Sequence, residues 1–149
     1  MEGIRFTSSE VQARKIFARL FPGTDLIPGI KALCQKHGVR SGSVTTMLGS
    51  LKKVSFVWAI PDSQNKSQVK YGAPKILEGP IELISGAGAI GTMKGGSELA
   101  VHLHATFSDP TSKIWGGHLI EEGNPVAVTV EIVIDAFDGL GLERDIDEE

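Results

Sequence analysis

Glycine and proline divide most of the chain beyond residue 42 into short β-prone segments. Strands favour β-branched and aromatic residues, whereas Gly, Pro, Asn and Asp mark the turns between them. The predicted strands cover residues 43–48, 54–60, 76–90, 98–108, 113–120 and 126–134, with a short edge strand near 69–71. We expect Gly49-Ser50 to connect the first two strands tightly. The last three strands are expected to be successive antiparallel strands.

One segment shows the spacing of a helix instead. Its apolar residues recur three or four positions apart, at Leu26, Ile30, Leu33 and Cys34. Thr24 or Asp25 is placed to cap its start, and Gly38 is placed to end it in the left-handed conformation. Residues 11–20 remain ambiguous, because they alternate as in a strand and also fit a helix.

Length and charge restrict the class of protein. The chain has 149 residues, the size of one domain, and its net charge of −3 argues against wholesale binding to phosphate backbones. The grouped basic residues are Arg14, Lys15 and Arg19, followed by Lys52 and Lys53. Binding to nucleic acid would therefore need a local patch.

Cysteine use and hydropathy indicate the compartment. Cys34 is the only cysteine, so no internal disulfide and no cysteine-rich metal site can form, and we interpret it as a core residue. Residues 1–10 lack the apolar centre of a signal peptide, and no apolar run approaches the roughly 18 residues that a membrane span needs. We therefore predict a cytoplasmic protein with no membrane partner.

Glycines are concentrated between residues 86 and 91, within one of the predicted strands. Their mixture with apolar residues indicates a bent strand or a bulge. The run has the G-x-G-x-x-G spacing of dinucleotide loops, but it leads into a turn rather than a helix. We therefore predict no bound nucleotide cofactor.

Three histidines form a candidate metal site. His102 and His104 are two positions apart, so in a strand both project from the same face. His118 follows Gly116-Gly117, and a hairpin could bring it beside them. Three neutral imidazoles suit a divalent ion such as Zn²⁺ and leave a fourth position open. The alternative is that these histidines are satisfied by hydrogen bonds, and spacing alone does not decide between the two.

Glu131 is a candidate catalytic residue. It lies in the middle of an apolar strand, where a carboxylate is costly to bury unless it is paired or near a metal. It could then support a metal ligand or act as a general base. The alternative is that the strand has one solvated face and Glu131 points outward.

Six stretches together resemble the plant-and-prokaryote conserved (PPC) domain family. They are Phe21-Pro22-Gly23-Thr24-Asp25-Leu26, Leu48-Gly49-Ser50-Leu51, LEGPIELIS at 77–85, His102-Leu103-His104-Ala105, Gly116-Gly117-His118-Leu119 and Thr129-Val130-Glu131-Ile132. They are collinear from about residue 11 to residue 137. The paired H-x-H and G-G-H stretches are fairly specific.

The resemblance implies an α+β domain with a strongly bent antiparallel sheet packed with one main helix, about residues 24–37. It implies a PPC domain at residues 11–140 between an N-terminal tail, 1–10, and an acidic C-terminal tail, 141–149, and it favours a strand at 11–20. It also implies a homotrimer with His102, His104 and His118 as metal ligands. Plant members join the domain to AT-hooks, Arg-Gly-Arg-Pro segments that enter the minor groove of DNA, and this chain contains none.

The leading functional hypothesis is a homotrimer whose open three-histidine site holds a divalent metal, zinc, and binds or acts on a small-molecule ligand. An enzyme of this kind would perform metal-dependent hydrolysis, with Glu131 as the base. One alternative is a regulatory protein that associates with DNA without an AT-hook, as prokaryotic members of the family are often described. Another is an interaction module in which the metal stiffens the fold.

Overall fold

The computed structural model describes residues 4–65 and 67–145 of the chain. This part is mostly β-sheet with one helix, as predicted. In chain order the elements are β1 (Gln12–Leu20), α1 (Leu26–His37), β2 (Gly42–Val57), β3 (Ala59–Pro61), β4 (Val69–Tyr71), β5 (Lys75–Met93), β6 (Leu99–Ser108), β7 (Ile114–Leu119), β8 (Val126–Asp138) and β9 (Glu143–Arg144).

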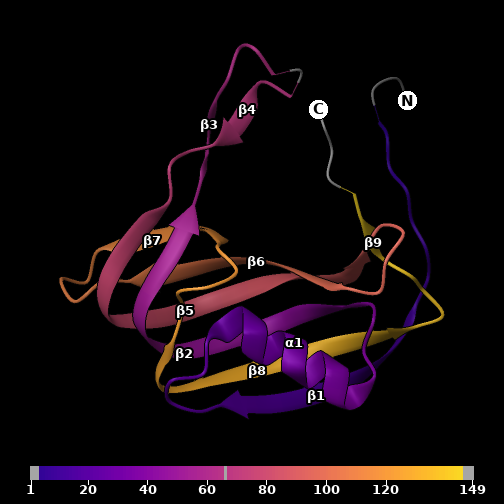
Figure 1. The fold of residues 1–149 in the computed structure, drawn as a ribbon, viewed down its shortest axis with the longest axis horizontal. Coiled ribbons are helices and arrows are strands. Elements are labelled where there is room, and N and C mark those ends of the chain that lie inside the picture. Colours follow the sequence, from indigo (N-terminus) through magenta and orange to yellow (C-terminus); the bar gives the residue numbers. More distant parts are fainter. Residues whose placement is uncertain (1–3, 66, 146–149) are drawn as a thin grey trace.

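Seven strands form one sheet in the order β1-β8-β2-β7-β6-β5-β9, and β2 also pairs with β5. All these pairings are antiparallel except that of β9, which runs parallel to β5. Figure 1 shows β2 and β5 strongly curved, and α1 lying across the sheet near β8 and β1. Strands β3 and β4 pair only with each other and extend from the sheet; we call residues 59–71 the β3–β4 arm. The predicted bent antiparallel sheet is confirmed.

The hydrophobic core fills the space between α1 and the sheet. Leu26 and Ile30 of α1 are fully buried. The residues that pack with them come from β2, β5, β6 and β8, and include Val44, Met47, Leu51, Ile81, Leu83, Leu103, Phe107, Val130 and Ile132. Buried and more accessible residues alternate along β6, so the burial of Leu103 directs His102 and His104 to the face away from the core.

Strand β2 differs from the prediction. The sequence predicted two strands with a tight connection at Gly49-Ser50, whereas β2 is one continuous strand of 16 residues. Its pairing with β8 shifts register just after Gly49, where φ is 147°. Glycine therefore bends the strand rather than ending it, because it adopts a backbone conformation that residues with a Cβ rarely reach.

The last three strands are not all neighbours. Strands β6 and β7 form the predicted antiparallel hairpin, but β8 pairs with β1 and β2 instead of β7. The loop before β8 is held at the start of α1, where the Asp25 carboxylate accepts hydrogen bonds from the backbone N–H groups of Gly123 (2.7 Å) and Asn124 (3.2 Å). Asp25 stands at the N-cap position, yet its side chain makes no capping bond to α1. Its carboxylate fixes the loop rather than the helix.

Part of the predicted C-terminal tail belongs to the sheet. Strand β9 lies within the predicted acidic tail, 141–149, and its two residues pair with Thr92 and Met93 of β5. The start of the predicted N-terminal tail, residues 1–3, lies outside the described residues, as do residues 146–149. The division into a domain and two tails stays a prediction. Among the described residues, no helix has the length and apolar character required to cross a membrane.

Candidate metal centre

The structure brings the three predicted histidines together. The Nε2 atoms of His102 and His104 are 2.9 Å apart, and one ring nitrogen from each of the three imidazoles lies within 4.8 Å of the others. His104 of β6 is the direct cross-strand partner of His118 of β7. The hairpin that the sequence suggested is therefore the element that assembles the cluster.

Glycine lets β7 reach this position. A Cβ atom on Gly117 would lie 2.5 Å from the carbonyl oxygen of Val57 and 2.8 Å from the ring of Phe56, both on β2. Only a residue without a side chain leaves room for β7 between β2 and β6. The Gly-Gly pair before His118 thus sets where its imidazole stands.

Tyr71 of the β3–β4 arm joins the cluster, and sequence reasoning missed it. Its hydroxyl lies 3.3 Å from Nδ1 of His118, with the two rings 5.1 Å apart between centroids. A partner on one imidazole nitrogen fixes the orientation of the ring and leaves the other nitrogen, here Nε2, for an ion. The sequence predicted an edge strand near 69–71, but nothing in its pattern linked that strand to His118.

The electrostatics of the cluster favour neutral imidazoles. Burial lowers the pKa of His102, and the nearby charges of Arg144 and His104 lower it further. Burial also lowers the pKa of His118, to about 4, with contributions from His102, His104 and Arg144. Neutral imidazole is the form that binds a metal ion, because its lone pair is free.

The cluster fits a tetrahedral ion with one open position. Zinc–nitrogen bonds of about 2.0–2.1 Å separate two ligand nitrogens by roughly 3.3 Å, close to the 2.9 Å between His102 and His104. Two cavities flank the histidines, one of about 440 Å³ beside His104 and one of about 230 Å³ between His102 and β9. A ligand in either cavity would lie next to an imidazole.

Glu131 is not brought into the cluster within one chain. It lies on β8, and its carboxylate accepts a hydrogen bond of 2.5 Å from the Arg19 guanidinium on β1. Its other cross-strand neighbour is Leu48 of β2. The ion pair with Arg19 is one of the ways in which the sequence analysis expected a carboxylate to be stabilised in this strand. The role of Glu131 as a general base stays a prediction.

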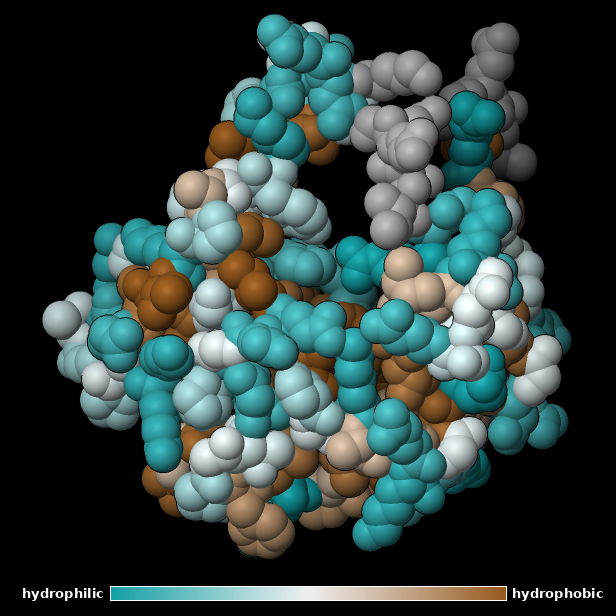
Figure 2. Space-filling model, viewed as in Figure 1, coloured by the Kyte–Doolittle hydropathy of each residue, from teal (hydrophilic) through white to brown (hydrophobic). Residues whose placement is uncertain are grey.

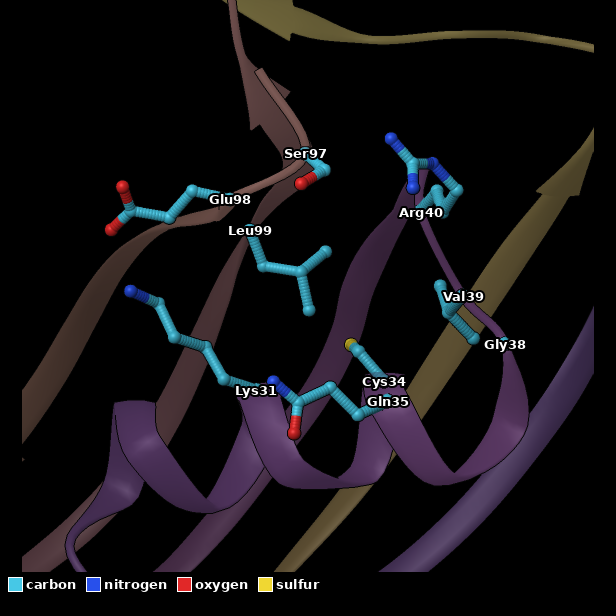
Figure 3. A pocket seen from close by; sticks show the side chains of 9 residues that line it. All are labelled: Lys31, Cys34, Gln35, Gly38, Val39, Arg40, Ser97, Glu98 and Leu99. Atoms are coloured by element: carbon cyan, nitrogen blue, oxygen red, sulfur yellow. The ribbon is translucent and has the colours of Figure 1, made fainter.

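A cavity of about 540 Å³ lies away from the histidines, between α1 and the segment that leads into β6. Figure 3 shows Lys31, Cys34 and Gln35 on α1, with Leu99 opposite Cys34 and Arg40 on the segment that follows the helix. The thiol is buried, which raises its pKa to about 11. It is therefore protonated at neutral pH, in agreement with its predicted place in the core.

The turn of the β6–β7 hairpin is held by Asp109. Its carboxylate accepts hydrogen bonds from the Thr111 hydroxyl (2.6 Å), from the backbone N–H groups of Thr111 and Lys113, and from the Trp115 indole (2.9 Å). The hydrogen bonds from the Thr111 hydroxyl and the Trp115 indole are the main reason why the pKa of Asp109 is lowered to about 2.

Replacing Asp109 with alanine is expected to lower Tm in a pH-dependent way. Because the pKa is lower in the folded state, this carboxylate stabilises the protein fully above its ordinary value of 3.8 and stops doing so as the pH falls through about 2. The Tm difference between wild type and Asp109→Ala, measured by differential scanning calorimetry, should be constant near neutral pH and shrink across that acidic window. Asp138→Ala, at the exposed end of β8, is the control. A difference that is independent of pH would contradict the role given to the carboxylate.

Comparison with known sequences finds the same domain. The profile described as the Plants and Prokaryotes Conserved (PCC) domain matches residues 7–138. A relative, the Bifunctional protein GlmU of a Synechococcus strain, is 28% identical over 116 residues, which are 78% of this chain and 16% of that protein. The chain therefore spans about a sixth of the length of that relative.

Two solved structures share the fold. A metal-containing protein from Archaeoglobus fulgidus has a TM-score of 0.77 and 21% sequence identity, with 97% of this chain and 94% of that chain covered. A plant- and prokaryote-conserved protein from Pyrococcus horikoshii has a TM-score of 0.76 and 24% identity, with 93% and 90% covered. At these identities the likeness establishes the fold.

Proposed function

This chain belongs to the Plants and Prokaryotes Conserved domain family, and from that premise we propose that it is a metal-binding protein whose His102, His104 and His118 hold a divalent ion, zinc, at a site open to a small ligand. The observation that carries the proposal is the convergence of three imidazoles, from two strands, on one point of the sheet face that the helix does not cover. The similar fold of a metal-containing archaeal protein supports it.

The residues of the site have distinct tasks in this proposal. His102 and His104 offer their Nε2 atoms, and His118 offers its Nε2 while Tyr71 orients its ring through Nδ1. Zinc held by three histidines would supply a Lewis acid and a bound water of lowered pKa, the chemistry of metal-dependent hydrolysis. Glu131 is not one of the three proposed ligands, and its role as a base stays a prediction; one of its carboxylate oxygens accepts a hydrogen bond from Arg19.

A homotrimer is part of the proposal. Large apolar side chains stand exposed on the sheet face away from α1, among them Phe17 on β1 (66% exposed), Leu48 on β2 (45%) and Ile84 on β5 (47%). Figure 2 shows hydrophobic residues on the surface near the base of the β3–β4 arm. In sequence next to the arm, Trp58 directly before β3 and Ile76 near the start of β5 are also exposed. Surfaces of this kind commonly bind other protein chains, and here we propose other copies of this chain.

Elemental analysis of tag-free protein tests the metal. Wild type is expected to hold about one zinc ion per chain after reconstitution and dialysis, and His104→Ala is expected to lose it, because three ligands become two. His104 is exposed, so its truncation leaves the core unchanged. His37→Ala is the matched control, since His37 ends α1 and lies outside the cluster.

Two outcomes would contradict the proposal: wild type without metal, or His104→Ala with as much metal as wild type. Light scattering in the same run measures the oligomer, for which a mass about three times the 15.9 kDa of one chain is expected. Binding of the protein to immobilised duplex DNA that weakens steeply as the salt concentration rises would instead support the alternative of a DNA-associated regulatory protein.

A further inference from the structure

We propose that the metal site selects small carboxylates, and that Arg144 of β9 is the residue that binds the carboxylate group. The inference rests on the proposed metal function, since it names the ligand of that same site. It starts from the cavity of about 230 Å³ that His102 and Arg144 line together. Neither Arg144 nor the strand that carries it was singled out by the sequence.

Backbone hydrogen bonds hold β9 beside the histidines. The N–H of Thr92 donates to the carbonyl of Leu142 (2.9 Å), and the N–H of Lys94 donates to the carbonyl of Arg144 (3.0 Å). On the other side, the N–H of Leu142 donates to the Ser41 hydroxyl (3.2 Å). These contacts fix Leu142 on both sides and Arg144 on the side of β5, so Arg144 lines the cavity from a paired strand.

Among the described residues, Arg144 has no carboxylate partner, whereas Arg19 pairs with Glu131. Glu143 also lines the cavity and adds one negative charge at its rim. The guanidinium is nevertheless close enough to the histidines to act on both His102 and His118. An anion placed between Arg144 and a divalent ion held by the neutral histidines would be attracted from both sides.

The shape and lining of the cavity indicate the rest of the ligand. Apart from His102, Glu143 and Arg144, the lining is small or apolar: Ala89, Ile90, Gly91, Ala100 and Leu142. A volume of about 230 Å³ is below the range of roughly 300–1,000 Å³ typical of sites for drug-sized molecules. A short aliphatic body fits such walls, and a carboxylate matches the planar fork of a guanidinium. These features together favour a short-chain carboxylate.

Isothermal titration calorimetry with butyrate as the probe tests the inference. Zinc-loaded wild type is expected to bind butyrate at millimolar concentration or below, and not its uncharged analogue butyramide. Arg144→Gln should weaken butyrate binding at least about ten-fold, because it removes the charge and one side of the fork. Arg144→Lys should recover part of the loss. Arg40→Gln, in the separate cavity beside α1, is the matched control and should bind as wild type does.

The zinc content of every variant separates this inference from the proposed function. Arg144→Gln that keeps its zinc and loses butyrate supports the inference. Arg144→Gln that binds butyrate as tightly as wild type overturns it, even with zinc in place, and so does wild type that binds no butyrate. Inorganic phosphate that binds more tightly than butyrate overturns the assignment to carboxylates. If wild type holds no zinc, the proposed function fails, while butyrate binding that still depends on Arg144 supports the carboxylate cavity by itself.

Discussion

Gly49→Ala is expected to lower the free energy of unfolding by the largest amount of any single substitution considered for this fold. A Cβ atom on Gly49 would lie 2.1 Å from the carbonyl oxygen of Thr129 and 2.7 Å from the Cα of Val130, both on the backbone of β8. The backbone of Gly49 also has a φ of 147°, which an L side chain strains. Relief of the clash would force β2 and β8 apart in the middle of the sheet. We expect a loss of about 3 kcal/mol or more, against a total stability of about 5–15 kcal/mol for a typical domain.

Urea denaturation followed by circular dichroism measures this loss. Gly141→Ala is the matched control, because a Cβ atom at Gly141 meets no atom within 4 Å and its φ is not in the positive region. Its midpoint should stay near that of wild type. A Gly49→Ala protein with a wild-type midpoint would show that β2 can straighten at this point, and would contradict the glycine bend as the source of the sheet's curvature.

The sequence predicted where the helix and strands lie along the chain better than which strands pair with each other. Apolar spacing and Gly38 placed the helix correctly, and the β-prone segments correspond to the observed strands. The pairing of β8 with β1 and β2 was missed, because it depends on contacts between residues at least 75 positions apart, such as Leu51 with Val126. Gly49 was taken for a turn residue, since a glycine that bends a strand and one that ends it look alike without the partner strand.

In the candidate site, too, features set by local sequence were predicted and those set by distant contacts were not. Two-residue alternation in β6 put His102 and His104 on one face, and the short hairpin turn brought His118 to them, so local rules were sufficient for the three histidines. Tyr71 and Arg144 reach the cluster only through the β3–β4 arm and the parallel pairing of β9. No local sequence pattern indicates that Tyr71 or Arg144 lies near the histidines. The residues that would hold the metal could thus be predicted, whereas those around it could not.

The site and the fold also depend on one buried amide. Asn124 is fully buried in the loop before β8, where its Oδ1 accepts a hydrogen bond from the backbone N–H of Ser55 (2.8 Å) and its Nδ2 donates to the carbonyl of Ile120 (2.7 Å). Ser55 lies on β2, and Ile120 directly follows β7. The amide therefore joins β2 to the strand that carries His118.

Asn124→Ala is expected to destabilise the protein by about 2–6 kcal/mol, because it leaves the buried N–H of Ser55 and the partly buried carbonyl of Ile120 without their partner, at about 1–3 kcal/mol each. For a chain of this size the loss corresponds to a decrease in Tm of roughly 5–15 °C, measurable by scanning calorimetry. Asn65→Ala, which removes an amide from an exposed turn, should change Tm much less. If the two variants had the same Tm, water would have to replace the Asn124 amide, and the link between β2 and the end of β7 would not need this side chain. The predicted loss would instead mean that the position of His118 relies on a side chain six residues further along the chain.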